Sequence, residues 1–488
     1  MSNAIVEMNA IELSQAIHAK KVSCREVMSA YLDHISTVNP SVNAIVTLVD
    51  ADRLLKQADE RDAELAAGND RGWMHGFPQA VKDLMPTQGI RTTMGSLIFK
   101  DFVPDADGAI VSRMKRDGAI IIGKTNTPEF GYGSQTYNEV FGPTANPYDE
   151  RLTSGGSSGG AAAALAVRMQ AVTDGSDFMG SLRNPAGWCN VCSLRPSIGA
   201  IPSGAGDLFS NTMATCGPMG RRVADIALLF NTMAGYDARF PMSRDPDARF
   251  RSLTPENAAQ MLSSSQKGVR VAWIGDWSGY FPVDPEIMAL GRAAVEKMTE
   301  FGAIVEEIPA FWDMDDFWDK IWIPIRHYCA NSLKMHYDKC KQGLMKPESR
   351  WEYEDGQSMS AGDVYRAFVR RTEFLHAMLR VYEKYDYIVS PTAVCFPFDK
   401  TTHWPEVVNG RAMKTYHNWM QIVTPWTMGG NAVCTMGAGF GTAGLPIGIQ
   451  IAAAPHREWE VLQFAQAYEN VTNYIAKFPP KYKLIINN

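Results

Sequence analysis

The sequence predicts an α/β protein, and two stretches of the chain support this prediction. In residues 76–235, short apolar runs alternate with helical stretches and dense Gly/Ser turns, as they do in βα units. Residues 269–274 are then typical of a strand and residues 284–301 of a helix, with Pro285 in its first turn and Gly302 just past its end. The chain has 488 residues, 45% hydrophobic and 20% charged, so it can bury a large core. Disordered and collagen-like classes are excluded.

Residues 1–75 are predicted to form N-terminal helices in front of this α/β core. Ser23 and Glu26 have the spacing of a capping box, and apolar residues recur at helical intervals from Val27 to Ile35. Residues 76–238 are the predicted core.

The rest of the chain divides at a stretch rich in Pro, Asp, Arg and Ser, residues 239–265, which is the predicted connector. Residues 266–488 form a C-terminal α/β part. It holds an aromatic-rich helical segment at 311–382 and strands at 387–391 and 445–451. Length alone leaves one to three domains open.

Charge and terminal composition argue against several classes of protein. Lys and Arg number 47 against 53 Asp and Glu, a net charge of −6, so we expect no nucleic-acid ligand. The amino terminus has no basic segment followed by an apolar run, and a cytoplasmic location is expected. The longest uncharged candidate for a membrane span, residues 431–455, contains five Gly and two Pro, which favours short buried strands over a spanning helix.

Two local motifs suggest metal or nucleotide chemistry, and their context argues against both. Cys189 and Cys192 form a C-x-x-C pair without a second pair at zinc-site spacing, so small buried thiols and no metal are expected. Residues 118–125 match the phosphate-loop pattern G-x-x-x-x-G-K-[ST]. Their four intervening residues are Ala and three Ile, which favour a buried strand, so an NTP-binding protein is the less favoured alternative. A further match, S-x-x-K at residues 112–115, lies on an ordinary amphipathic helix.

Two Gly/Ser segments are the candidate site. Residues 154–160 hold four Gly and three Ser directly before an alanine-rich helix, which places hydroxyl groups near a helix amino end. A flexible linker would not run into such a helix. In the second segment, Ser181 follows a tight turn at Gly180, where backbone N–H groups can converge on an oxyanion.

The candidate base is a lysine. None of the nine His lies in the Gly/Ser block, and His75 lies only near its edge, so a Ser-His-Asp triad is not supported. Lys82 follows an apolar strand, where desolvation can lower its pKa enough to leave the amine neutral.

These motifs resemble those of the amidase signature hydrolases, over most of the chain. Lys82 lies in the family's V-K-D segment, Ser157 matches the bridging serine with an unusual cis peptide, and Ser181 matches the acylated nucleophile. The remaining matching segments are Gly76–Pro78, Gly123–Asn126, Phe141–Pro147, Gly217–Arg221 with Asp225, and Gly444–Gln450.

The resemblance implies a single α/β domain over residues 1–488, in which a central mixed twisted sheet is covered by helices on both faces. It also implies a Ser-cisSer-Lys triad of Lys82, Ser157 and Ser181. The backbone N–H groups of Phe178, Met179, Gly180 and Ser181 would bind the oxyanion. No metal or organic cofactor is implied, and a homodimer is common in such enzymes.

The sequence departs from the family pattern at four positions. Phe178 and Met179 replace the usual glycines before the nucleophile, where their side chains can narrow the site. Asn184 replaces an aliphatic residue, and Ser154 stands where proline is frequent. All three triad positions are intact, so these differences indicate a subgroup of active enzymes.

A free-standing amidase with a small-molecule amide substrate is the predicted function. The main alternative is the A subunit of a tRNA-dependent glutamine amidotransferase, whose length is compatible. An apolar or aryl group on the substrate is favoured by the aromatic residues of the C-terminal half, although core packing also explains such rings. These residues are Phe311, Trp312, Phe317, Trp318, Trp322, Trp404, Trp419 and Trp426.

Overall fold

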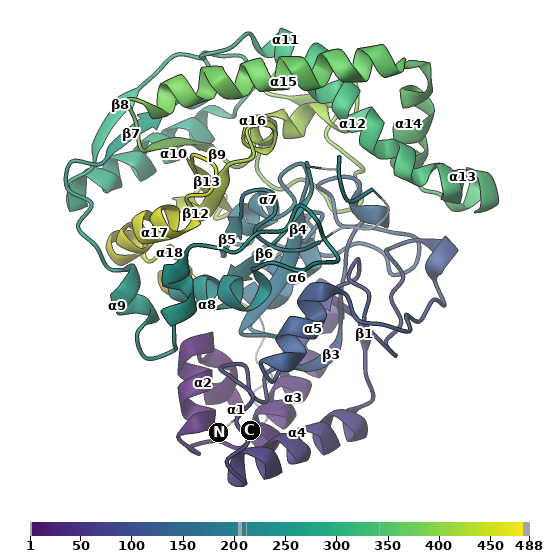
Figure 1. The fold of residues 1–488 in the computed structure, drawn as a ribbon, viewed down its shortest axis with the longest axis vertical. Helices are drawn as coiled ribbons and strands as arrows, with labels where there is room; N and C mark the ends of the chain where they lie inside the picture. Colours follow the sequence, from purple (N-terminus) through teal and green to yellow (C-terminus); the bar gives the residue numbers. More distant parts are fainter. Residues whose placement is uncertain (1, 204–206, 211, 341, 482–488) are drawn as a thin grey trace.

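The computed structural model describes residues 2–203, 207–210, 212–340 and 342–481. The predicted N-terminal and C-terminal parts also include Met1 and residues 482–488, which lie outside the described residues. The N-terminal helices are α1 (Ser2–Glu7), α2 (Ala10–His18), α3 (Cys24–Val42) and α4 (Ala51–Ala66), drawn in purple in Figure 1. The capping box is confirmed: the Ser23 hydroxyl accepts the Glu26 N–H at 3.0 Å, and the Glu26 carboxylate accepts the Ser23 N–H at 2.8 Å.

A mixed sheet of eight strands forms the centre of the molecule, as the resemblance implies. Its order is β4-β6-β5-β12-β13-β9-β7-β8, antiparallel from β4 to β9 and parallel from β9 to β8. The strands are β4 (Val172–Asp177), β5 (Cys192–Arg195), β6 (Thr215–Gly220), β7 (Arg270–Trp273), β8 (Ile304–Glu307), β9 (Tyr387–Pro391), β12 (Ala432–Phe440) and β13 (Pro446–Ala453). The uncharged stretch of the sequence is therefore a buried antiparallel pair, β12 and β13.

A separate three-stranded sheet lies against β4, a division that the sequence did not reveal. It comprises β1 (Ile45–Leu48), β3 (Ile120–Thr125) and β2 (Pro78–Lys82), with β2 parallel to β3 and β1 antiparallel to it. The apparent phosphate loop is β3 itself. Lys124 is fully buried there and donates to the Met85 carbonyl at 2.5 Å and the Thr87 hydroxyl at 2.9 Å. This segment is therefore a buried strand and does not form an open phosphate-binding loop.

Helices cover both faces of the central sheet. Gly217 and Gly220 lie three residues apart in β6, so side chains at these two positions would lie on opposite faces of the sheet. A side chain at Gly217 would meet Leu182 beside α7, whereas one at Gly220 would meet Ile226 of α8. The helices around the sheets are α5 (Ala109–Arg116), α6 (Gly159–Ala166), α7 (Arg183–Trp188), α8 (Val223–Met233), α9 (Ala258–Leu262), α10 (Pro285–Lys297), α16 (Thr424–Met428), α17 (Glu458–Thr472) and α18 (Tyr474–Lys477).

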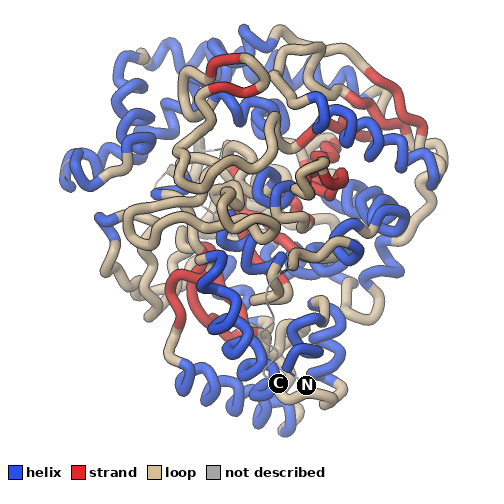
Figure 2. Tube along the Cα trace, turned by 180° about the vertical axis from the view of Figure 1, so that it is seen from behind, coloured by secondary structure: helices blue, strands red, loops and turns tan. Residues whose placement is uncertain are grey.

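The aromatic-rich segment is helical, as predicted, and forms the upper part of the molecule in Figure 1. Figure 2 shows the molecule from behind, with the helices in blue and the strands in red. The segment comprises α11 (Met314–Phe317), a π-helical turn at Trp318–Trp322, α12 (Ile323–Ala330), α13 (Lys334–Cys340), α14 (Pro347–Asp355) and α15 (Ala361–Tyr382). A small hairpin, β10 (Val407–Val408) and β11 (Arg411–Ala412), follows β9.

Three further findings concern membrane helices, cysteines and clusters of metal-binding side chains in the part of the chain that the structure describes. Within it, none of the helices is long and apolar enough to cross a membrane. Cys189 and Cys192 are buried free thiols, and burial raises the pKa of both well above the usual range. The described residues hold no group of three or more His, Cys, Asp or Glu that could bind a metal ion.

Candidate active site

Lys82 is the last residue of β2, and its side chain is fully buried. Its amine donates to three hydroxyl groups: Ser157 at 2.8 Å, Ser158 at 2.9 Å and Ser176 at 3.0 Å. Burial lowers the pKa of Lys82 to about 7, because a charged amine loses its hydration there. A large share of these amines is therefore neutral near pH 7, as the proposed base requires.

Ser157 and Ser158 end the glycine-rich turn that leads into α6. The Gly156–Ser157 peptide bond is cis, which the resemblance implies. The Ser134 hydroxyl donates to the Gly156 carbonyl at 2.5 Å and fixes this turn from the neighbouring loop. All eight residues of α6 are buried, which confirms a packed helix behind the serines and excludes a flexible linker.

Ser181 lies in the turn that joins β4 to α7. Gly180 has a φ of +81°, a left-handed conformation that favours glycine, and a side chain there would approach Val423 to 2.8 Å. The Ser158 N–H donates to the Ser181 carbonyl at 3.1 Å, so the two serine segments are directly joined. Lys82, Ser157 and Ser181, far apart in the sequence, are brought to one place.

One of the four predicted oxyanion donors already has a partner. The Gly180 N–H donates to the Asp177 carboxylate at 3.0 Å, and the Leu182 N–H donates to its other oxygen at 3.1 Å. An amide that faces this carboxylate is poorly placed for an oxyanion. We therefore narrow the proposed donors to the N–H groups of Phe178, Met179 and Ser181.

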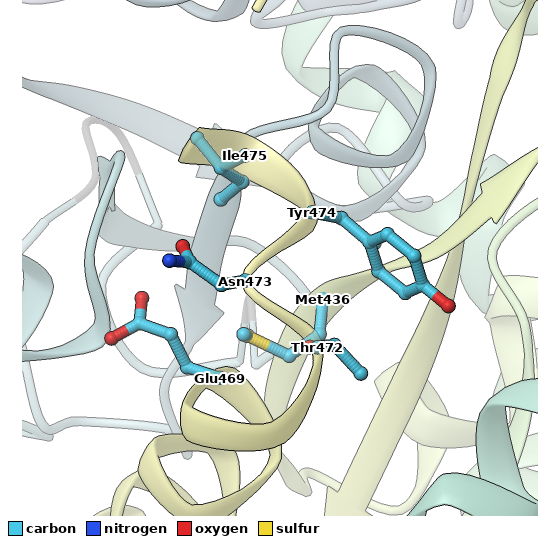
Figure 3. A pocket seen from close by; sticks show the side chains of 7 residues that line it. Met436, Glu469, Thr472, Asn473, Tyr474 and Ile475 are labelled. Atoms are coloured by element: carbon cyan, nitrogen blue, oxygen red, sulfur yellow. The ribbon is translucent and has the colours of Figure 1, made fainter. Parts of the chain in front are cut away.

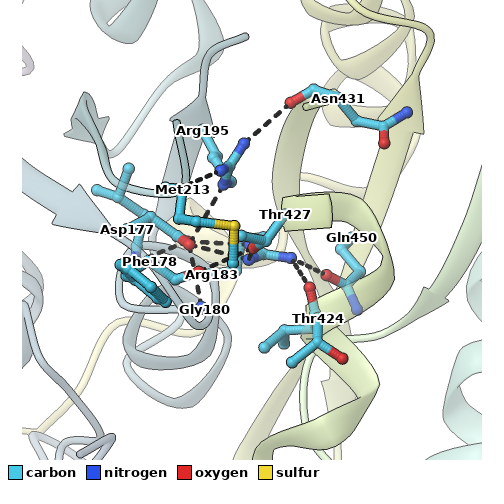
Figure 4. Close-up of polar contacts among 12 residues, drawn as sticks. Asp177, Phe178, Gly180, Arg183, Arg195, Met213, Thr424, Thr427, Asn431 and Gln450 are labelled. Carbon is cyan, nitrogen blue, oxygen red and sulfur yellow. Dashed lines mark hydrogen bonds and ion pairs between the residues drawn. The ribbon is translucent and has the colours of Figure 1, made fainter. Parts of the chain in front are cut away.

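Behind the nucleophile segment lies a buried ionic network that the sequence did not reveal (Figure 4). Arg183 makes two hydrogen bonds to Asp177, at 2.9 and 3.0 Å, and Arg195 forms an ion pair with the same carboxylate at 3.4 Å. Burial alone would raise the pKa of Asp177, but the two guanidinium groups outweigh it, and the pKa lies well below the usual range.

The network also reaches distant elements of the C-terminal part. Arg183 donates to the Gln450 side chain of β13 at 2.9 Å and to the Thr427 hydroxyl of α16 at 2.9 Å. Thr427 in turn donates to the Phe178 carbonyl at 2.9 Å. The turn before Ser181 is thus held by side chains from both halves of the chain.

Phe178 forms an aromatic wall beside the nucleophile segment. Its ring makes an edge contact with Trp322, with centroids 6.0 Å apart, and the Arg326 guanidinium lies 4.6 Å from its centroid. Arg326 also lies 4.6 Å from the Tyr132 ring and donates to the Glu352 carboxylate at 2.8 Å. The guanidinium is therefore held between two aromatic rings by a buried acid.

Of the eight large rings noted in the sequence, the fully buried Trp322 contacts Phe178 behind the turn that leads to Ser181, and Trp318 stacks on Trp322 with ring centroids 6.0 Å apart. Others pack in the core: Trp419 stacks on Trp188 at 5.4 Å, and Trp426 lies 5.8 Å from Trp277. Core packing accounts for these two rings.

Two cavities among the described residues lie away from the triad. One of about 10 Å³ lies where α17 and α18 meet β12, and it holds at most one water molecule (Figure 3). The other is a cleft of about 250 Å³ at the start of α15. Its lining is Tyr328, Asn331, Gly356, Met359, Ser360, Ala361 and Val364.

Comparisons with known proteins show relatives over nearly the whole chain. The Amidase family model matches residues 26–462. The chain is 32% identical to an acylamidase of Rhodococcus erythropolis over 97% of each chain. It is also 32% identical to the A subunit of the glutamyl-tRNA(Gln) amidotransferase of Heliobacterium modesticaldum, over 96% of this chain and 97% of that one.

A solved structure shows the same fold. It is a bacterial aryl acylamidase of the amidase signature family, 26% identical, with a TM-score of 0.89 over 99% of this chain and 100% of that one. This chain belongs to the amidase family. It has the amidase signature fold and is an amide-hydrolysing enzyme.

Proposed function

We propose that this enzyme is a free-standing amidase that cleaves a carboxylic amide through an acyl-enzyme on Ser181. The observation that carries the proposal is the Lys82 amine, which is buried, has a pKa of about 7, and donates to Ser157 at 2.8 Å. A neutral amine at this position can accept a proton from a serine hydroxyl.

The proposed reaction passes protons along the triad in two coupled transfers. Neutral Lys82 takes the proton of Ser157, and Ser157 takes that of Ser181 as the Ser181 oxygen attacks the amide carbon. The N–H groups of Phe178, Met179 and Ser181 stabilise the oxyanion. Ser157 then protonates the leaving nitrogen and regains its own proton from Lys82 as the C–N bond breaks, which returns the Lys82 amine to its neutral form. In the second half, a water molecule gives a proton to Ser157 and attacks the acyl carbon, and Ser181 is released with its hydroxyl restored.

The substrate that we propose carries an apolar or aryl group. Phe178 replaces a small residue beside the nucleophile, and its contacts with Trp322 and Arg326 form an aromatic and cationic wall. Such a wall favours a flat substrate ring through apolar contact with the half-buried Phe178 ring. The likeness to an acylamidase and to an aryl acylamidase supports the same substrate class.

The second candidate is the A subunit of a glutamine amidotransferase. It is favoured by relatives of that name with the same 32% identity as the acylamidase. In that role the site would release ammonia from glutamine for a partner subunit. Phe178 and Met179, in place of two glycines, argue against it because they leave less room for a polar amino acid.

A substrate screen separates the two candidates. We expect the purified chain to release amine from anilides and aryl amides, with kcat/KM at least about tenfold higher than for glutamine, a difference of about 1.4 kcal/mol. Ser181→Ala should lose both this activity and the single adduct that a fluorophosphonate probe leaves on the wild type. Ammonia release confined to glutamine, or copurification with partner subunits, would favour the second candidate. An adduct that persists in Ser181→Ala would show that another residue is the nucleophile.

A further inference from the structure

Asp174 joins the strand of the base to the strand of the nucleophile. It lies in β4, which leads to Ser181, and both its carboxylate oxygens accept the backbone N–H of Lys82 in β2 at 3.2 Å. The Gln170 side chain accepts the Ala80 N–H at 3.1 Å just beside it. These bonds connect the three-stranded sheet to the eight-stranded sheet, so Asp174 helps to set where Lys82 stands relative to the serines.

The carboxylate of Asp174 is fully buried beside two lysines. Burial raises the pKa of Asp174 to about 6, although Lys124 and Lys82 oppose this shift. The group is therefore mostly an anion at pH 7 and above. Its negative charge favours the protonated form of the neighbouring Lys82.

The other groups that face Lys82 contribute less charge near pH 7. Cys216, on the adjacent strand β6, stays neutral because burial raises the pKa of its thiol to about 11. Asp177 is an anion, but Arg183 and Arg195 balance its charge. Lys124 faces Asp174 from β3 and shares that carboxylate with Lys82. Of the two aspartates whose charge acts on the Lys82 amine, Asp177 is paired with guanidinium groups, whereas the cations that face Asp174 are Lys124 and Lys82 itself.

We propose that Asp174 is a positioning residue, whose hydrogen bonds hold Lys82 in register with the serines and whose charge sets the pH at which the Lys82 amine can accept a proton. The inference rests on the proposed role of Lys82 as the base. Without the Asp174 charge the ammonium form loses a stabilising partner, so Lys82 gives up its proton at lower pH.

The test is the pH profile of kcat/KM in Asp174→Asn, which keeps an acceptor for the Lys82 N–H and removes the charge. We expect the acidic limb to move down by about 1 pH unit, as an opposite charge at close range typically shifts a pKa by 1–3 units. The rate on the plateau should stay within about fivefold of the wild type, a change of about 1 kcal/mol. Asp174→Glu, which keeps the charge, should restore the limb toward its original position.

Asp225→Asn is the matched control. Asp225 is also a fully buried carboxyl that accepts backbone N–H groups, those of Ala10 and Ile11 at 3.3 and 3.2 Å, but at the start of α2. The Asp225→Asn variant should leave the acidic limb of the kcat/KM profile unmoved. If Asp174→Asn does not fold, Asp174→Ser, which is also uncharged, is measured in the same way.

The outcomes distinguish this inference from the proposed function. A folded, uncharged variant at position 174 with an unmoved acidic limb overturns the inference, provided that Lys82→Ala is inactive. Equal shifts in the Asp174 and Asp225 variants would also overturn it, because the effect would then be general. A folded Lys82→Ala with normal turnover instead removes the proposed function, together with the role given to Asp174.

Discussion

At the scale of single residues, the site depends on the state of one amine. Lys82 donates to three serine hydroxyls and is fully buried, so its charged form loses its hydration. Desolvation is the largest influence on its pKa and outweighs the nearby carboxylates. The outcome, a pKa of about 7, suits a general base at neutral pH.

Removing the base or the relay should stop turnover without unfolding the chain. We expect Lys82→Ala or Ser157→Ala to lower kcat by on the order of 10²-fold or more, since each supplies proton transfer. In the wild type, kcat/KM should rise with pH through about 7, because the reactive form of Lys82 is the neutral one. Steady-state kinetics across pH 5–9 and circular dichroism check both points.

Ser158 gives this prediction a close comparison, because its hydroxyl lies at nearly the same distance from the Lys82 amine, 2.9 Å. Ser158→Ala should cost less turnover than Ser157→Ala. The opposite order would make Ser158 the relay, and a folded Lys82→Ala with near-normal kcat would eliminate the mechanism.

At the scale of elements, the nucleophile segment was predictable and the wall beside it was not. The turn at Gly180 and the packed helix after Ser158 follow from local glycine and alanine patterns. Which aromatic ring reaches Phe178 depends on how the π-helical turn at Trp318–Trp322 docks, a contact between residues far apart in the chain. Composition alone made Trp322 and Trp426 equal candidates for the apolar part of the site, yet Trp426 packs on Trp277.

Shortening the wall should change substrate preference more than rate. Trp322→Leu removes the ring that contacts Phe178, and losing part of a buried aromatic contact costs about 1.4–2.8 kcal/mol. We expect kcat/KM for benzoyl or phenylacetyl amides to fall about 10- to 100-fold relative to acetamide. The measurement is a series of amides with acetyl, butyryl, hexanoyl, benzoyl and phenylacetyl groups.

Trp459→Leu serves as the control, since Trp459 of α17 is also buried but packs on Phe250. That variant should keep the wild-type ratio between acyl groups. A flat or inverted trend in the wild type, or an unchanged ratio in folded Trp322→Leu, would refute the apolar wall and direct attention to small polar amides.

At the scale of the whole molecule, local patterns predicted most elements but not how the strands divide into sheets. The strands at 269–274 and 387–391 and the helix at 284–301 were found in the sequence, because each has its own periodicity and end signals. Strand partners leave no such local signal. Hence the separate sheet of β1, β2 and β3 was missed, and with it the bond between Lys82 and Asp174 across 92 positions.

The network around Asp177 has the same long-range character and should control the stability of the whole chain. Arg183 joins Asp177 to Thr427 of α16 and Gln450 of β13. The four side chains in these hydrogen bonds are fully buried. Arg183→Leu leaves the Asp177 charge with one weaker partner, so we expect a loss of about 3–5 kcal/mol. Urea unfolding followed by circular dichroism at pH 7 measures it. Because the pKa of Asp177 is lowered by folding, its share of the stability is present above the unfolded value near 3.8 and is lost only in stronger acid.

The exposed pair of Arg151 and Asp149 offers the control: Arg151→Leu should leave the unfolding midpoint unchanged. Equal midpoints for both variants would show that the network positions the turn before Ser181 without holding the two halves of the chain together.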